Sequence, residues 1–412
     1  MLMEDFISRR TILFVGGGTE TVPAVKTAKD LNLKVVVSDI NPNAPCSKEA
    51  DFFIQSSTYD YEDTIEKINE YAKVNEPIDG VICIATDVPF TVAKIAERFK
   101  LPGIAVNSAK IVSDKLLMKD IFTSHNIPIP WYTEINSNNE LFELQKKNSF
   151  PLVIKPVDSR GARGVLKLTD DVDLNWAYNY AFNESPTSRV MVEKFMPGPQ
   201  VSTESLIING ISHTIGFSDR NYEYLDLYFP HFIENGGQLP SLLNMRLQHS
   251  INDLIEKAAL SLGIKNGVIK GDIVITDEKP YIIEVAARLS GGYFCTHEIP
   301  LNTGINFVEL AIKQSLGDTI SSKDLEKKIN NPVAQRYIFP KPGKVVDIVI
   351  PDWINNDKEI NFFEVRIKKG DIVPKAQNHP SRSGVVITTS NTVDAAIRKA
   401  EKVIASVNIT TE

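Results

Sequence analysis

Cysteine is scarce in this chain of 412 residues, which contains only Cys46, Cys83 and Cys295. The three lie far apart in the sequence and form no CxxC pair, which argues against a secreted disulfide framework. The six histidines show no metal-ligand spacing, so a zinc site is disfavoured. We therefore expect a protein of a reducing compartment and predict a cytoplasmic location.

Long apolar runs are also missing. No stretch approaches the ~18 apolar residues that a membrane helix needs, so we expect no membrane partner. Glu4 and Asp5 lie in the first ten residues, and the apolar segment that follows extends only from Ile12 to Val15 before glycines begin. We interpret this segment as a first strand and not as a signal peptide.

The chain has no excess of basic residues. Lys and Arg together number 45, Asp and Glu number 52, and the formal net charge is −7 at pH 7. A dedicated nucleic-acid binder carries a basic footprint, so we expect no nucleic-acid partner. The hydrophobic fraction of 42% and the charged fraction of 24% are typical of globular α/β proteins and exclude a disordered or fibrous one. At ~100–200 residues per domain, the length predicts two to four domains.

The first hundred residues alternate between strand and helix patterns. Short apolar, often β-branched runs predict strands at 11–15, 34–39 and 80–85. Helical spacing of apolar residues predicts helices at about 20–31, 61–73 and 88–99. Such alternation is typical of βαβ units with a parallel sheet covered on both faces.

Short strands separated by Gly and Pro dominate the rest of the chain, after a helix and linker at 107–126. The predicted strands are 152–156, 165–168, 190–195, 201–208, 213–218, 271–276, 281–286, 334–338, 344–350, 364–367 and 384–389. Further helices are predicted at about 247–262 and 392–405. We divide the chain into four parts, residues 1–106, 107–210, 211–330 and 331–412.

A glycine turn, Gly16-Gly17-Gly18, joins the first strand to the first helix. Such a turn can present backbone N–H groups to an anion at a helix N-terminus. Asp39 follows about 20 residues later, where a dinucleotide-binding fold contacts ribose. The spacing is GGGTET and not GxGxxG, so a tight turn that packs the helix on the sheet is an equally weighted interpretation.

Lys155 lies inside an apolar run, FPLVIKP at 150–156. A lysine in such a strand is costly unless it meets an anion. The loop after it, at 158–165, holds two glycines, a serine and two arginines, which can supply N–H donors and positive charge to phosphates. The alternative is an ordinary hairpin with a snorkelling lysine.

A second apolar strand, at 190–196, runs into a Pro-Gly turn. The open end of such a strand offers backbone N–H and C=O groups, which could contact the edge of an adenine ring. From the residues alone, a plain strand followed by a turn is the favoured interpretation.

Asp272 and Glu284 lie at matching height on two strands joined by a hairpin turn at 277–280. Carboxylates on rigid neighbouring strands suit Mg²⁺, which takes one or two of them together with substrate phosphates. Arg288 follows closely and could neutralise negative charge in phosphoryl transfer. Because both acids interrupt apolar runs, exposed surface charges are the weaker alternative.

The order and spacing of these segments resemble the ATP-grasp superfamily over nearly the whole chain. The resemblance is carried by VGGG at 15–18, DINPNAP at 39–45, VIKP at 153–156 and EVAAR at 284–288. Within the superfamily the chain is most similar to carboxylate–amine ligases of the L-amino-acid ligase type, through FIENGGQLP at 232–240, RYIFP at 336–340, GDIV at 370–373 and SRSG at 381–384.

The resemblance implies an α/β protein with the ATP-grasp fold. Residues 1–106 would form a Rossmann-like pre-ATP domain, 107–210 the linker and small lobe, 211–330 the large lobe with the metal site, and 331–412 a mixed α/β extension. The two lobes would clasp ATP between them. Dimer contacts through the first domain are common among similar proteins, which makes a homodimer one candidate assembly, and the oligomeric state is left open.

The resemblance also implies a role for each matching residue. Nucleotide binding falls to Lys115, Lys155, Ser159, Arg160, Gly161, Ala162, Gly164, Glu193, Lys194, Phe195, Met196 and Gln200. Mg²⁺, or Mn²⁺ in its place, would bind Asp272 and Glu284. Lys155 and Arg288 would be catalytic. Substrate would contact Glu234, Arg288, Ser290, Gly291 and Gly292.

Three positions depart from the usual pattern of the superfamily. Gln200 stands where an acidic residue usually binds ribose, and Asp272 where the first metal ligand is commonly Glu. Ala286 stands where an Asn commonly coordinates metal, and alanine cannot. The number of Mg²⁺ ions is therefore left open.

The implied activity is an ATP-dependent ligation. ATP phosphorylates a small carboxylate such as an amino acid, an amine attacks the acyl phosphate, and an amide, ADP and phosphate result. The partners would thus be a small carboxylate and an amine. The alternatives are a carboxylase or purine-biosynthesis-type ligase with the same fold, and a catalytically degenerate nucleotide-binding protein, which Ala286 favours.

Overall fold

The computed structural model describes residues 9–412. Glu4 and Asp5, on which the interpretation of the N-terminal segment depended, lie outside the described residues. From Arg9 onward, no helix is long and apolar enough to cross a membrane.

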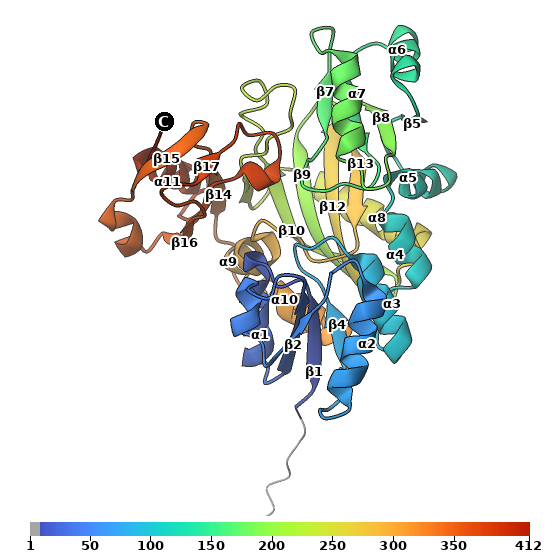
Figure 1. Cartoon of the computed structure of the whole chain (residues 1–412), viewed down its shortest axis with the longest axis vertical. Coiled ribbons are helices and arrows are strands. Elements are labelled where there is room, and N and C mark those ends of the chain that lie inside the picture. Colours follow the sequence, from blue (N-terminus) through green and yellow to red (C-terminus); the bar gives the residue numbers. More distant parts are fainter. Residues whose placement is uncertain (1–8) are drawn as a thin grey trace, which may run out of the picture.

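The N-terminal domain is a parallel four-stranded sheet in the order β3-β2-β1-β4. Its strands are β1 (Thr11–Val15), β2 (Lys34–Asp39), β3 (Phe52–Gln55) and β4 (Gly80–Ile82). Helix α1 (Val22–Asp30) covers one face, and α2 (Tyr61–Ala72) and α3 (Pro89–Phe99) cover the other (Figure 1). Alternate residues of β1 point to opposite faces and are buried in two different hydrophobic clusters, as a doubly covered sheet requires.

Two predictions in this domain differ from the structure. Strand β3 was not predicted: it is a short edge strand whose apolar run, Phe52 to Ile54, has only Ile54 buried. The strand predicted at 80–85 ends at Ile82. Beyond that point the chain leaves the sheet, and Ile84 forms a parallel bridge with Leu289, more than two hundred residues later.

Two short helices, α4 (Val106–Val112) and α5 (Lys115–Ser124), follow the first domain. The sequence pattern predicted one helix and a linker here. The break falls at Asp114, whose side chain accepts hydrogen bonds from the backbone N–H groups of Leu116 and Leu117 and so caps α5. This cap places Lys115 at the first residue of a new helix.

A small antiparallel sheet in the order β5-β8-β6-β7 comes next. Its strands are β5 (Tyr132–Ile135), β6 (Leu152–Pro156), β7 (Leu166–Leu168) and β8 (Val190–Lys194). Helices α6 (Asn138–Lys147) and α7 (Leu174–Asn183) pack on it and contribute to one hydrophobic cluster. These two helices and β5 were not predicted, since their apolar faces are short.

The largest sheet has eight strands in the order β13-β12-β9-β10-β11-β14-β18-β16. Its first five members by chain order are β9 (Gln200–Ile208), β10 (Ile211–Arg220), β11 (Gly237–Leu239), β12 (Gly267–Thr276) and β13 (Lys279–Ala286). Helix α8 (Met245–Ser261) packs on this half. Helices α9 (Ile299–Thr303) and α10 (Phe307–Ser315) connect the sheet to the N-terminal domain.

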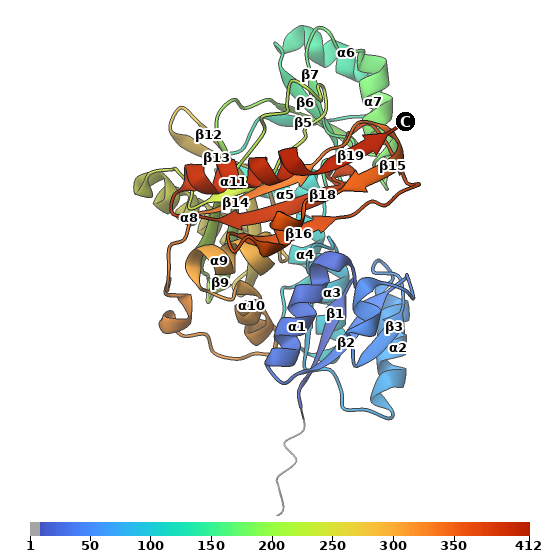
Figure 2. The ribbon, with the colours of Figure 1, turned by 90° about the vertical axis from the view of Figure 1, so that its left-hand side faces the viewer.

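The C-terminal residues extend the same sheet. Strands β14 (Val333–Ile338), β16 (Ile360–Val365) and β18 (Gly384–Thr389) complete it, and α11 (Val393–Ser406) lies across them (Figure 2). A separate small sheet contains β15 (Gly343–Val349), β17 (Ile372–Val373) and β19 (Asn408–Thr411). The strand predicted at 364–367 is wrong by about four residues, because the segment that pairs with β18 starts at Ile360.

Sheet pairing crosses two of the predicted domain borders. The border at 210 falls in the turn between β9 and β10, which pair along most of their length. The border at 331 separates β11 from β14, which are neighbours in the large sheet. Residues 211–330 and 331–412 therefore share one sheet. The division of the chain into four parts stays a proposal.

Candidate active site

Two connected cavities lie where the parts of the chain meet. The larger has a volume of about 850 Å³ and the smaller about 130 Å³. The larger is lined by the N-terminal domain, the large sheet and the C-terminal region, and the smaller by the small sheet and β9, β10, β12 and β13. The residues that line both are Lys115, Ser159, Arg160, Gly161, Ala162, Arg163, Arg220, Asp272, Glu284 and His379. This shared wall joins an apolar slot to a charged chamber.

The smaller cavity contains almost all of the residues that the sequence assigned to a nucleotide. Its apolar wall includes Val153, Phe195, Phe232 and Ile283, which suit a flat aromatic ring. The predicted residues on its lining are Lys115, Lys155, Ser159, Arg160, Gly161, Ala162, Glu193, Lys194, Phe195, Met196 and Gln200. An aromatic slot that opens onto several cations fits a nucleotide.

Gly164 is the exception among the predicted nucleotide residues, because it lines neither cavity. Its φ is +72°, and a Cβ at this position would lie 2.5 Å from Pro156 Cγ and 2.9 Å from Glu184 Cβ. The glycine is needed so that the loop can fold back against the end of β6.

A buried charge cluster lies at the wall of the smaller cavity. Lys155 Nζ is 2.6 Å from Glu193 Oε1, and Lys119 Nζ is 3.0 Å from the other carboxylate oxygen. Although burial opposes ionisation, the two ammonium groups hold the pKa of Glu193 below its usual value. Two cations against one carboxylate leave a net positive charge beside the slot. Lys155 thus forms an ion pair with Glu193 and also lines the smaller cavity, where an anion could bind.

Lys119 was missed in the sequence. It lies on α5 between the buried residues Met118 and Phe122 and is itself fully buried. Burial lowers the pKa of Lys119 to about 8, even though Glu193 favours its charged form. The available signal was a lysine on the apolar face of a short helix, which helical periodicity treats as a surface residue.

The loop at 159–164 is fastened on three sides. Lys115 Nζ donates to the carbonyl oxygen of Ser159 at 2.7 Å. Arg160 donates to the carbonyl oxygen of Asp87 at 2.9 Å, and its guanidinium group lies 4.9 Å from the centre of the Tyr59 ring. The N–H group of His379, in the C-terminal region, donates to the carbonyl oxygen of Gly161 at 3.0 Å. The loop therefore covers the junction of the cavities and can exclude water from it.

Asp272 and Glu284 lie directly opposite each other on β12 and β13, as predicted. Asp272 Oδ1 accepts hydrogen bonds from Arg220 at 2.6 Å and Ser202 at 3.1 Å, and Oδ2 is bonded to Lys270. Burial favours the neutral form, but Arg220 and Lys270 outweigh it and lower the pKa of Asp272.

Glu284 differs from its neighbour, because its side chain is 37% exposed and faces the cavity, with Lys115 Nζ 3.5 Å away. Within residues 9–412 there is no group of three or more His, Cys, Asp or Glu side chains that could hold a metal ion. One open carboxylate, a second that is already bonded to two cations, and an alanine at 286 make a donor set that fits one Mg²⁺ delivered with phosphate oxygens.

The predicted substrate residues surround the larger cavity. Arg288 Nε lies 3.5 Å from Asp87 Oδ1, and the backbone N–H group of Gly292 donates to Glu20 Oε2 at 2.7 Å. Ser290 donates its backbone N–H group to the buried Glu204 at 3.0 Å. Gly291 packs closely on the N-terminal domain, since a Cβ there would lie 3.0 Å from Ala85 Cβ. The loop 290–292 is thus shaped by the N-terminal domain.

Glu234 lies between two arginines of the larger cavity. It is bonded to Arg220, and its Oε1 is 3.4 Å from Arg382 Nη2. Arg382 also stacks on Tyr337, with 3.9 Å between the guanidinium carbon and the ring centre. Residues that line the cavity and were given no role from the sequence include Arg220, Lys270, Glu298, Arg366, His379 and Arg382. They come from strands, a π-helical turn and C-terminal loops, and no local pattern marks them.

The glycine turn after β1 supports the packing interpretation. Gly16 donates its N–H group to the carbonyl oxygen of Ser38, and Gly17 donates to Asp39 Oδ2, each at 2.8 Å. Neither glycine nor Asp39 lines a cavity. Asp39 therefore binds the turn itself and not a ribose. The nearest residue of this segment that reaches the larger cavity is Glu20.

Known families match two regions of the chain. Residues 112–292 match the ATP-grasp domain, and residues 336–412 match the L-amino acid ligase C-terminal domain 2. Among curated proteins, the uncharacterized protein y4rH of Sinorhizobium fredii is 27% identical over 347 residues, which are 81% of this chain and 69% of that protein. The carbamoyl phosphate synthase large chain of Vibrio cholerae is 21% identical over 77% of this chain, which spans only 29% of that relative.

Solved structures show the same fold over the whole chain. The L-amino acid ligase of Bacillus licheniformis superposes with a TM-score of 0.83 at 21% identity, covering 98% of this chain and 99% of that one. Phosphoribosylglycinamide synthetase of Anaerococcus prevotii gives a TM-score of 0.74 at 20% identity, covering 98% and 100%.

The matched domain and the slot suited to a nucleotide define the class of the protein, which is one with an ATP-grasp domain. The match at residues 336–412 adds a second domain to this description. The chain thus has an ATP-grasp domain followed by a C-terminal domain of the kind found in L-amino acid ligases.

Proposed function

We propose that the protein joins a small carboxylate, such as an amino acid, to an amine through an acyl phosphate, with release of ADP and phosphate from ATP. The observation that carries this proposal is the junction of the two cavities. A slot suited to a nucleotide opens, at Lys115 and Glu284, into a chamber large enough for two small substrates.

The residues at the junction have complementary tasks in this proposal. Lys115 and Lys155 hold the phosphates, with Lys119 adding charge from behind Glu193. Arg288, at the edge of the larger cavity, neutralises the negative charge that develops on the transferred phosphoryl group. The loop 159–164 keeps water from the acyl phosphate, which water would otherwise hydrolyse.

The nucleotide and metal contacts follow the same placement. Backbone groups of 193–196 meet the adenine, Gln200 meets the ribose through a neutral side chain, and Glu284 with Asp272 holds a single Mg²⁺, for which Mn²⁺ can substitute. When bound, the ion supplies positive charge to the phosphates. Glu234 and the loop 290–292 face the carboxylate and the amine.

The test is a phosphate-release screen over pairs of amino acids and other small carboxylates with Mg·ATP. We expect at least one pair to give stoichiometric ADP, phosphate and amide. Lys155→Ala should abolish the substrate-dependent release of ADP. An unaltered rate in this variant would remove Lys155 from the proposed site.

A second candidate is a carboxylase or purine-biosynthesis-type ligase. The size of the larger cavity favours it, because about 850 Å³ also accommodates a phosphorylated sugar amine. The likeness to phosphoribosylglycinamide synthetase supports the same candidate. Bicarbonate and phosphoribosylamine therefore belong in the screen. Tight ATP binding without ADP release from any substrate would favour a degenerate nucleotide-binding protein.

The assembly and location remain proposals as well. A homodimer through the first domain is one candidate assembly, and light scattering on the purified chain tests it. A cytoplasmic location agrees with the three cysteines, which are buried and not joined by disulfides. Burial raises the pKa of both Cys46 and Cys83 to about 12, so neither is a reactive thiolate.

A further inference from the structure

One acid of the larger cavity differs from all the others. Seven carboxylate side chains line this cavity, namely Glu20, Asp87, Asp158, Glu234, Asp272, Glu284 and Glu298. Six of them accept a hydrogen bond or form an ion pair with another residue. Glu298 has no such partner among the described residues, although only 3% of its surface is exposed. A buried carboxyl group without a partner is costly, so Glu298 points to a ligand.

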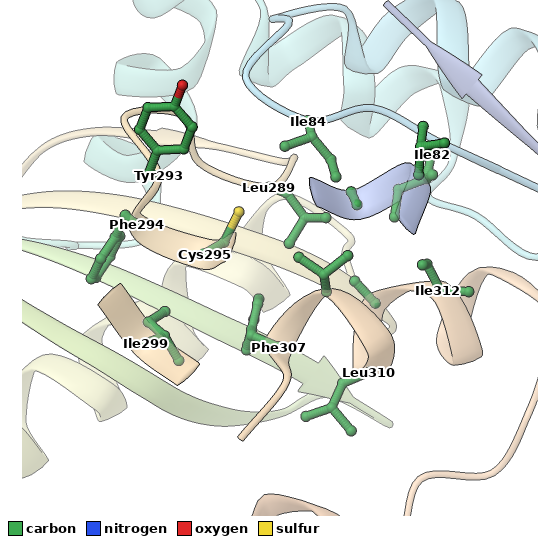
Figure 3. Close-up of a cluster of buried hydrophobic side chains, with 14 of the residues drawn as sticks. Ile82, Ile84, Leu289, Tyr293, Phe294, Cys295, Ile299, Phe307, Leu310 and Ile312 are labelled. Carbon is green, nitrogen blue, oxygen red and sulfur yellow. The ribbon is translucent and has the colours of Figure 1, made fainter. Parts of the chain in front are cut away.

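The local structure holds Glu298 in place. It ends a π-helical turn, Phe294–Glu298, in which its N–H group donates to the carbonyl oxygen of Tyr293 at 3.2 Å. Phe294, Cys295 and Ile299 around it are buried in the hydrophobic cluster drawn in Figure 3. π turns of this kind occur frequently at functional sites. The backbone of Glu298 is therefore fixed where its side chain lines the larger cavity.

The surroundings of Glu298 bring its pKa close to neutral pH. Arg336 on β14 and Arg382 in the C-terminal region favour its ionised form, and Tyr337 is the other ionisable neighbour. Burial outweighs the two arginines and raises the pKa of Glu298 to about 8. A carboxyl group that titrates near the working pH is suited to take up and release a proton.

We propose that Glu298 accepts a proton from the ammonium group of the amine substrate and so prepares it for attack on the acyl phosphate. This inference rests on the proposed function. The ammonium group passes one proton to the Glu298 carboxylate, and the nitrogen lone pair then forms the bond to the acyl carbon. The bond from that carbon to the phosphate oxygen breaks, and phosphate leaves with its electron pair and the second proton of the nitrogen. Glu298 returns its proton to water when the product leaves.

Hydroxylamine separates this step from the rest of the reaction. It is largely uncharged at neutral pH, so it attacks an acyl phosphate without first losing a proton. With Mg·ATP and the carboxylate substrate, Glu298→Gln should therefore form the hydroxamate at close to the wild-type rate. Its rate of amide formation with an ammonium-bearing substrate should fall roughly 100-fold, the usual contribution of a general base.

The pH profile gives a second readout. In the wild type, the rate of amide formation should rise with pH as Glu298 ionises, whereas in Glu298→Gln the rise should shift to the higher pH at which the amine itself loses its proton. Glu298→Asp should keep the rise at a reduced rate. Glu256→Gln is the matched control, because Glu256 lies on α8, accepts a hydrogen bond from Ser212 and lines neither cavity. It should behave as the wild type in both assays.

Three results would overturn the inference. The first is wild-type amide formation by Glu298→Gln with an unchanged pH profile. The second is a parallel loss of hydroxamate and amide, which would place Glu298 in folding or in carboxylate activation. The third is the absence of hydroxamate from the wild-type enzyme with every carboxylate tried, which would refute the proposed function itself and this step with it.

Discussion

Lys119 Nζ lies 3.0 Å from Glu193 Oε2, with the lysine side chain fully enclosed by the protein. Lys155 bonds the other oxygen of the same carboxylate. The three groups carry one positive charge more than they can neutralise among themselves. Since an uncompensated buried charge is costly, an anion in the adjoining slot would complete the cluster.

Substitution of Lys119 tests this charge cluster. Lys119→Met should weaken ATP binding about tenfold, which corresponds to ~1.4 kcal/mol, because the slot loses its excess positive charge. Burial lowers the pKa of Lys119 to about 8, so its ammonium group deprotonates above that pH and wild-type affinity should fall between pH 7 and 9.5. Calorimetric titration with ATP should show no such fall in Lys119→Met. Lys146→Met, on the surface of α6, is the control, and a wild-type affinity that stays flat with pH would contradict the prediction.

The contacts of Arg160 predict how closely ADP release is coupled to amide formation. Arg160→Gln removes the bond to the carbonyl oxygen of Asp87 and the stacking on Tyr59, so the loop should open and admit water. We expect more ADP than amide to be formed, since part of the acyl phosphate is hydrolysed. Tyr59→Phe keeps the ring face and should retain a ratio near one. If Arg160→Gln keeps equal yields of ADP and amide, the loop does not depend on this contact.

The donor set around Asp272 predicts a single metal ion. With Mn²⁺ and a non-hydrolysable ATP analogue, equilibrium titration followed by electron paramagnetic resonance should find one ion per chain. The physical reason is that Lys270 and Arg220 already occupy both oxygen atoms of Asp272 and that Ala286 offers no ligand. Ala286→Asn should raise the count toward two or strengthen the single site. Two tightly bound ions in the wild type would refute the prediction.

The glycine at 164 makes a prediction about stability. Gly164→Ala places a Cβ 2.5 Å from Pro156 Cγ on a residue with φ of +72°, so the free energy of unfolding should fall by about 2 kcal/mol. Gly18→Ala is the matched control, since nothing lies within 4 Å of its Cβ position and its φ is −66°. Urea unfolding of the three proteins measures the difference. Equal midpoints for Gly164→Ala and the wild type would show that the loop relaxes at no cost.

Much of the fold could be predicted from local patterns. Strands β1, β2, β6 and β18 were predicted with the bounds that the structure has. These strands are buried, and a buried strand has a nearly continuous run of apolar residues that can be recognised in the sequence. The pattern failed at β3, β5 and α6, which are half-exposed. It also failed at β16, where only pairing with β18 decides the register.

The candidate site shows the same division. Lys155, Asp272 and Glu284 stood out in the sequence because each interrupts an apolar run. The structure brings Asp272 and Glu284 to the junction of the cavities and Lys155 to the wall of the smaller one. Lys119 and Glu298 could not be found in this way. Each is a charged residue whose burial depends on segments far away in the chain, and helical spacing alone does not distinguish a buried lysine from an exposed one.

The sequence by itself determined many of the strands and the order of the charged motifs, since apolar periodicity dictates local elements, and that order resembles the ATP-grasp superfamily. Only the tertiary structure decided how the charges are paired. Glu193 meets two lysines, Asp272 meets Arg220 and Lys270, and Glu298 meets no partner within residues 9–412. The reason is physical, because the strength of an electrostatic interaction depends on distance and burial, and neither is written in the spacing of residues along the chain.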